Sequence, residues 1–179
     1  MPGRMGVEVG VLESLFTSLV AVEVSDVLAQ GFIERDSTPP KFVPLARVWY
    51  LELDDGFLRL ESVRDEVQLV MRRVSEIEPP KELDAEDEEF ALASHGALFF
   101  DTAGPALPIT KIRYVTNERS DLEKGVLRYV EFELLNSQRI VFDPKWHYGI
   151  RPGPTGMYER LVAESRQSEK SVAEYFWVP

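Results

Sequence analysis

The chain has 179 residues, of which 44% are hydrophobic, and this is enough to form one globular domain with its own core. It contains no cysteine, which excludes a disulfide framework, a thiol nucleophile and a cysteine-based zinc site. The formal net charge of −11 disfavours binding to nucleic-acid phosphates and to anionic membrane surfaces.

The first forty residues carry a helical pattern and then a strand pattern. Apolar residues at helical spacing predict a short helix over residues 11–17. Alternating valines then predict a strand over residues 18–25, and Phe32 extends this strand beyond a break at Gly31. Three prolines within residues 36–44 predict a loop.

Residues 47–60 have the pattern of a β-hairpin. Because successive side chains in a strand point to opposite faces, Trp49, Leu51 and Leu53 share one apolar face. Residues 55–56, Asp-Gly, suit a two-residue type I′ turn, in which both central residues need positive φ.

This turn sets the expected register of the first hairpin. It places Leu53 opposite Leu58 and Leu51 opposite Leu60, so that the apolar face continues across both strands. Alternating apolar residues at 66–74 predict a third strand of the same meander.

Residues 128–142 repeat this pattern. The repeated positions stand 81 residues later (128 against 47), and they are Arg128, Val130, Phe132 and Leu134 for Arg47, Trp49, Leu51 and Leu53. A three-residue loop at 136–138 keeps the faces matched through the pairs Leu134 with Ile140 and Phe132 with Phe142.

The repeated pattern has two interpretations. An internal duplication would make residues 11–75 and 97–151 two copies of one β unit, joined by an acidic loop at 76–89. The alternative is that any two half-buried hairpins look alike. In both cases we expect residues 1–179 to form a single domain.

The remaining segments complete the expected fold. Short apolar runs predict strands at 97–100 and 109–115, with Pro144 ending the second hairpin. Residues 152–179 predict a C-terminal tail with a short helix from Met157, docked through Phe176 and Trp177.

The even spacing of these signals predicts a mainly β fold, at the margin of α+β. We expect antiparallel meanders of roughly seven or eight strands, arranged as a sandwich or partly open barrel, with one or two short helices. The hairpin faces predict the core, which consists of Trp49, Leu51, Leu53, Leu58, Leu60, Val130, Phe132, Leu134, Ile140 and Phe142.

The sequence also predicts a cytoplasmic protein. No apolar run approaches the roughly twenty residues that span a bilayer. The longest run near the start, residues 15–22, contains Thr17 and Ser18, so it does not have the pattern of a signal peptide. The absence of cysteine fits a reducing compartment.

Residues 76–89 are the strongest shift in composition. They hold eight carboxylates and one lysine. One interpretation is a docking strip for a basic protein partner, carried by Glu86, Asp87, Glu88 and Glu89. The other is a self-repelling, solvated tether, which is what such runs of charge more often are.

The densest group of chemically capable side chains is at the end of the second hairpin. It contains Asp143, Trp146, His147 and Tyr148. An Asp–His pair can perform general acid–base chemistry, but no Gly-x-Ser-x-Gly elbow supplies a nucleophile. The structural alternative is a turn whose aromatic residues plug one end of the core.

Two functions remain open. The first is a non-enzymatic acidic protein-binding module, of the inhibitor or immunity type, for a basic partner. The second is a small-ligand-binding protein or small enzyme with its site at residues 143–148. We expect no cofactor and no metal, because His95 and His147 lack ligand spacing and no phosphate or calcium loop is present. A pocket containing His147 would favour the second function.

Overall fold

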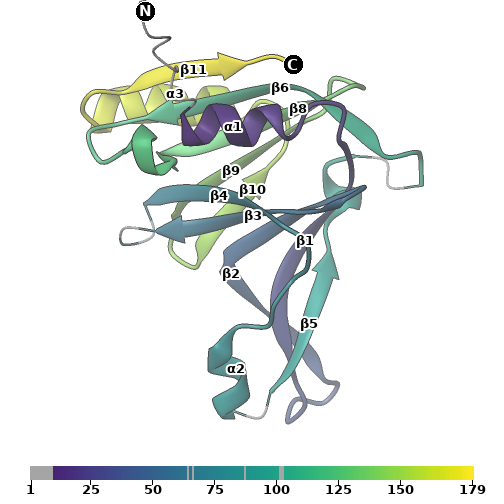
Figure 1. The fold of residues 1–179 in the computed structure, drawn as a ribbon. Helices are drawn as coiled ribbons and strands as arrows, with labels where there is room; N and C mark the ends of the chain where they lie inside the picture. Colours follow the sequence, from purple (N-terminus) through teal and green to yellow (C-terminus); the bar gives the residue numbers. More distant parts are fainter. Residues whose placement is uncertain (1–9, 64, 66, 87, 101–102) are drawn as a thin grey trace, which may run out of the picture.

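The computed structural model describes residues 10–63, 65, 67–86, 88–100 and 103–179, and for residues 84–86 it describes the backbone alone. Within these ranges the chain forms one antiparallel sheet of eleven strands with three short helices (Figure 1). The sheet is open, because β10 and β7 stand at the two ends of its strand order. The predicted mainly β fold of antiparallel meanders is confirmed.

The strands fall into two sets along the chain. The first set comprises β1 (Glu23–Glu34), β2 (Lys41–Leu53), β3 (Gly56–Val63), β4 (Gln68–Val74) and β5 (Glu89–Ser94). The second set comprises β6 (Leu107–Thr116), β7 (Val126–Leu127), β8 (Tyr129–Leu134), β9 (Arg139–Trp146), β10 (Gly149–Gly153) and β11 (Ala173–Trp177). The helices are α1 (Val11–Thr17), α2 (Lys81–Glu86) and α3 (Met157–Ser168), with short 3-10 turns at Gly96–Leu98 and Leu122–Lys124.

The strand order is the same in the two sets. Along the sheet it runs β10-β9-β8-β6-β1-β2-β3-β4-β7, so β6 and β1 are neighbours at the centre and a meander extends outward from each. Outside this path, β5 pairs with β1 and β11 pairs with β6. The long strands β1 and β2, together with β5, form an arm that ends beside α2 (Figure 1).

The start of the chain corrects two expectations. The helix at 11–17 is confirmed, but the strand begins at Glu23 and continues through Gly31 to Glu34. The predicted loop at 36–44 is shorter, because Lys41 already belongs to β2. Pro44 is tolerated inside this strand since it lies opposite Gly31, next to a register shift where the ladder is irregular.

The first hairpin keeps the predicted faces but not the predicted register. Leu53 lies opposite Gly56, and Leu51 lies opposite Leu58, two residues from the expected pairing. The turn is therefore at residues 54–55, followed by Gly56 with a φ of 132°. Only glycine suits this position, because a Cβ there would lie 2.7 Å from the carbonyl oxygen of Val74.

The second hairpin shows the same two-residue difference. Phe132 lies opposite Ile140, and Val130 lies opposite Phe142. The loop has three residues, as expected, but they are residues 135–137, and Ser137 adopts a left-handed conformation with a φ of 65°. A type I turn followed by a left-handed residue is a common three-residue hairpin connection.

Four further expectations are corrected. The expected strand at 97–100 is wrong, because its first residues form a 3-10 turn. Pro144 does not end the second hairpin, since β9 continues to Trp146, and Pro144 lies beside a register shift between β9 and β10. The acidic segment 76–89 is not the connection between the two sets, because it leads into β5, which pairs with β1. The strand count of seven or eight is too low, since the short β5, β7, β10 and β11 escaped prediction.

The C-terminal tail docks by strand pairing. β11 pairs with β6, and the half-buried ring of Trp177 lies 5.7 Å from the ring of Phe16 on α1. Phe176 points to the other side of β11 and is 73% exposed. The expected docking through Trp177 is therefore observed, and that through Phe176 is not.

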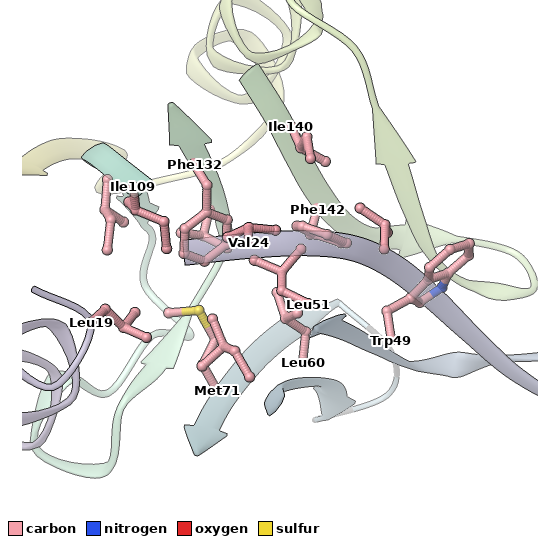
Figure 2. Close-up of a cluster of buried hydrophobic side chains, with 14 of the residues drawn as sticks. Leu19, Val24, Trp49, Leu51, Leu60, Met71, Ile109, Phe132, Ile140 and Phe142 are labelled. Carbon is pink, nitrogen blue, oxygen red and sulfur yellow. The ribbon is translucent and has the colours of Figure 1, made fainter. Parts of the chain in front are cut away.

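The main core is shared by both sets of strands. All ten predicted core residues are buried, including Leu51 and Phe132, which have no exposed surface. Figure 2 shows side chains such as Leu60, Ile109 and Phe142 converging on one interior. A second, smaller cluster lies under α3, on the opposite face of β8 and β9.

Replacing Leu51 or Phe132 by alanine should destabilise the protein by about 2–5 kcal/mol, because each change removes buried apolar surface and leaves a cavity. Urea denaturation measures the free energy of unfolding. Leu135→Ala is the control, since Leu135 is 63% exposed in the loop between β8 and β9. Equal stability of Leu51→Ala, Leu135→Ala and wild type would contradict the core assignment.

Candidate functional site

The candidate site is built on the β9–β10 hairpin. Trp146 and Gly149 face each other, so His147 and Tyr148 form a two-residue turn. Gly149 has a φ of 125°, and a Cβ there would lie 2.5 Å from the carbonyl oxygen of Ala46. The turn is therefore held directly against the backbone of β2 and cannot accept a side chain at Gly149.

The aromatic side chains of this turn are exposed. Trp146 and Tyr148 are 37% and 67% exposed, and their rings pack edge to face with centroids 5.0 Å apart. The ring of His147 lies 4.8 Å from that of Tyr148. The idea that these residues plug the core is therefore wrong, and they form an aromatic tip (Trp146, His147 and Tyr148) on the surface.

Asp143 lies apart from the aromatic tip. It is buried, and its carboxylate accepts hydrogen bonds from Arg128 Nη1 at 3.2 Å and from the Lys145 backbone at 3.0 Å. Within the described ranges no hydrogen bond joins Asp143 to His147, which is exposed at the turn. The structure thus separates the two members of the expected acid–base pair.

Arg128 is the centre of a buried ionic network. Its side chain is 3% exposed, and Nε donates to both carboxylate oxygens of Glu169 at 3.0 Å. Asn117 donates a further hydrogen bond of 2.6 Å to Glu169. Because Glu169 directly follows α3, the network fastens the end of this helix to the sheet.

A pocket of about 230 Å³ opens beside this network. Its walls come from β9, β10 and α3, and the lining includes Lys145, Arg151 and Ser165 together with Arg128 and Asp143. Cations and carboxylates are interleaved, and Lys145 lies 3.5 Å from Glu169. His147 does not line this pocket, so the pocket offers no histidine for acid–base chemistry.

Burial and hydrogen bonding shift the pKa of Glu169 in opposite directions. Burial tends to raise the pKa of its carboxyl group, but the hydrogen bond from Asn117 and the charge of Arg128 outweigh burial and hold the pKa below its usual value. Glu169 is therefore a charged anchor at neutral pH. Sequence reasoning missed both Arg128 and Glu169 as members of this site, although Arg128 stands at the repeated hairpin position of Arg47.

The acidic segment contains α2, which lies at the far end of the arm (Figure 1). Glu89 is exposed at the start of β5 and forms an ion pair with Arg35 of the β1–β2 turn, while Glu88 is half-buried. Asp87 and the side chain of Glu86 lie outside the described residues. The structure does not bring this segment to the β9–β10 turn, so the two predicted sites are separate.

In the part of the chain that the structure describes, no group of three histidine, aspartate or glutamate side chains is placed to hold a metal ion. His95 instead packs edge to face on Trp49, with ring centroids 5.1 Å apart. Among the described helices, none has the length and apolar character needed to cross a bilayer.

Comparison with protein-family models, curated proteins and solved structures finds no match to this chain. No activity or ligand can therefore be carried over from a relative. Fold alone does not define function, which depends on the geometry, burial and charge of particular side chains.

Asp143→Ala should destabilise the protein by about 3–5 kcal/mol, because it leaves the buried guanidinium of Arg128 without one of its two counter-ions. Chemical denaturation at neutral pH tests this. Glu164→Ala is the matched control, since Glu164 lines the same pocket but is exposed. If Asp143→Ala lowered the unfolding free energy by no more than Glu164→Ala does, the ionic network would contribute little to stability.

Tyr129 should make the protein sensitive to alkali. It is fully buried under Tyr158, and burial raises its pKa from 10.0 to about 12. The neutral phenol therefore stabilises the fold below pH 10, and this contribution of up to about 2–3 kcal/mol is lost as the pH rises from 10 to 12.

Tyr129→Phe should flatten the decline in unfolding free energy over this pH window, whereas Tyr148→Phe at the exposed turn should leave it unchanged. Denaturant titrations from pH 9 upward measure the difference. Identical pH profiles for Tyr129→Phe and wild type would contradict the assignment.

Proposed function

We propose that this protein is a non-enzymatic binding module that recognises a partner protein through the aromatic tip. The observation that carries this proposal is the exposure of Trp146 and Tyr148, packed on each other at the end of a short turn. Tryptophan and tyrosine are enriched among the residues that dominate binding energy at protein interfaces.

The conformation of the aromatic tip is restrained by packing. The close approach of Gly149 to Ala46 and the mutual packing of the rings limit the freedom of the turn before any partner binds. Little conformational entropy is then lost on association, which favours affinity. An exposed aromatic cluster of this kind otherwise costs solubility without benefit.

The charge of the chain suggests the nature of the partner. A net charge of −11 favours encounter with a basic protein and repels acidic ones. An inhibitor or immunity-type role for a basic partner fits this property. In this proposal the acidic segment 76–89 contributes to long-range steering, and the aromatic tip contributes the direct contact.

The alternative function has less support. A small-ligand protein or enzyme with its site at residues 143–148 would need Asp143 and His147 to act on one substrate. Asp143 is instead engaged by Arg128, and the adjoining pocket of about 230 Å³ is not lined by His147. This alternative would regain support if a turnover that depends on His147 were measured.

We also propose that the two sets of strands arose by internal duplication. The matching strand orders support it, as does the pairing of the last strand of each set with the first, β5 with β1 and β11 with β6. A helix precedes that last strand in both sets. These matches extend the proposed repeats beyond residues 11–75 and 97–151 to include α2 with β5 and α3 with β11.

Replacing Trp146 and Tyr148 together by alanine should abolish partner binding without unfolding the chain, because both side chains are exposed. Immobilised wild type and variant are compared for the proteins they retain from an extract of the native host, identified by quantitative mass spectrometry. Leu135→Ala is the matched control, since it removes an exposed apolar side chain from the β8–β9 loop, at the other end of β9.

The expected result is a basic protein that wild type and Leu135→Ala retain and the double variant loses. With the purified partner, the association rate should fall between low and moderate ionic strength. Neutral residues at 86–89 should weaken that salt dependence if the acidic segment steers the partner. Retention of the same proteins by the double variant would contradict the proposal.

A further inference from the structure

A second surface lies on the outer face of the first meander, away from the aromatic tip. There Tyr50 of β2, Arg59 of β3 and Arg72 of β4 form one row across three neighbouring strands, because Tyr50 pairs with Arg59 and Arg59 pairs with Arg72. A pocket of about 460 Å³ lies over this row, and Glu76 and Glu78 also line it. We name it the arginine pocket.

The two arginines of this row stand directly opposite each other. Like charges at such cross-strand positions destabilise a sheet unless an anion lies between them. Glu61 supplies part of this neutralisation, and its Oε2 lies 3.2 Å from an Nη2 atom of each arginine. One carboxylate oxygen is thus shared by two guanidinium groups, which together carry ten N–H donors.

Arg59 has a further donor without an acceptor. Its Nε atom is shielded from solvent and has no hydrogen-bond partner among the described residues. The third arginine of the lining, Arg73, is already occupied, because it donates to the carbonyl of Ser18 at 2.6 Å and pairs with Asp55. The donors that a ligand could reach are therefore the Nη groups of Arg59 and Arg72, whose side chains are 26% and 56% exposed.

Among the described residues, α2 is the helix that precedes the last strand of the first set, and it lies at the far end of the arm and not over this row (Figure 1). In the second meander the matching row is Glu131, Val141 and Gly153, and α3 covers it. A Cβ at Gly153 would lie only 1.9 Å from the sulfur of Met157 on α3, so the helix needs glycine there. Arg72 occupies the corresponding place in the first meander, where a long side chain would obstruct such a helix.

We propose that the arginine pocket binds the phosphate monoester of a small polar metabolite. The oxyanion is placed between the guanidinium groups of Arg59 and Arg72, and Glu76 and Glu78 accept hydrogen bonds from hydroxyl or amino groups of the ligand. A phosphate has enough oxygens and charge for two guanidinium forks, whereas a carboxylate matches one. The volume is within the range of small-molecule sites.

The test uses the full chain and glycerol 3-phosphate as the probe, with glycerol and sodium chloride at equal ionic strength as references. Isothermal titration calorimetry and amide NMR shifts measure binding. Arg59→Gln and Arg72→Gln should each weaken binding by about tenfold or more, as loss of a charge-assisted bidentate contact predicts. Arg160→Gln is the matched control, because Arg160 is an exposed arginine on α3.

Glu61→Gln separates a binding site from a structural ion-pair cluster. Glu61 competes with the ligand for both arginines, so its neutralisation should tighten binding of glycerol 3-phosphate. If Arg59, Glu61 and Arg72 form only a structural ion-pair cluster, no variant should bind glycerol 3-phosphate. Because Arg72 is 56% exposed, Arg72→Gln should remain folded, and a thermal melt confirms this for each variant.

Three results would overturn the inference. They are no saturable shift with the probe, an equal shift with sodium chloride alone, or unchanged affinity in Arg59→Gln and Arg72→Gln. The Trp146 and Tyr148 double alanine variant should bind the probe as wild type does. The arginine pocket and the aromatic tip can therefore succeed or fail independently.

Discussion

The hydrogen bond between Trp49 and Ile150 is the contact on which the interior depends. The buried indole N–H of Trp49 donates to the Ile150 carbonyl at 3.1 Å, and the adjacent Gly149 lets β10 approach the backbone of β2. These strands stand far apart in the sheet order, so the contact folds the open sheet over itself. The apolar faces of the two meanders thereby meet in one core, and the opposite face of each meander points away from that core.

The outer faces of the two meanders differ at one position of the matching cross-strand rows, where the second meander has Gly153 and the first has Arg72. Gly153 admits Met157 and allows α3 to lie on β8 and β9, where it buries Tyr129 and Val141. Arg72 stands in the corresponding row, which no helix of the described residues covers, and α2 is only six residues long. One face therefore became a second apolar cluster, and the other became an open polar pocket.

The sequence predicted which face each hairpin residue occupies, but not its partner. Side chains alternate with a period of two, so a shift of two residues leaves every face unchanged, and all ten predicted core residues are buried. The expected second register placed Asp143 opposite Glu131, a repulsive pair that argued against it. The sequence predicts strand ends at Pro44 and Pro144, because the register shifts that accommodate these prolines arise only from strand pairing.

The candidate sites were harder to predict because strand pairing assembles them. Asp143 and His147 are neighbours in sequence, yet the turn carries His147 to the surface while Asp143 joins Arg128 inside. In the first hairpin the expected register set Arg59 opposite Glu52, which would have neutralised it. The observed register sets Arg59 opposite Tyr50 instead and brings it into line with Arg72. The two-residue difference in the β2–β3 register thus decides whether the guanidinium group of Arg59 is neutralised by Glu52 on the neighbouring strand or can bind a ligand.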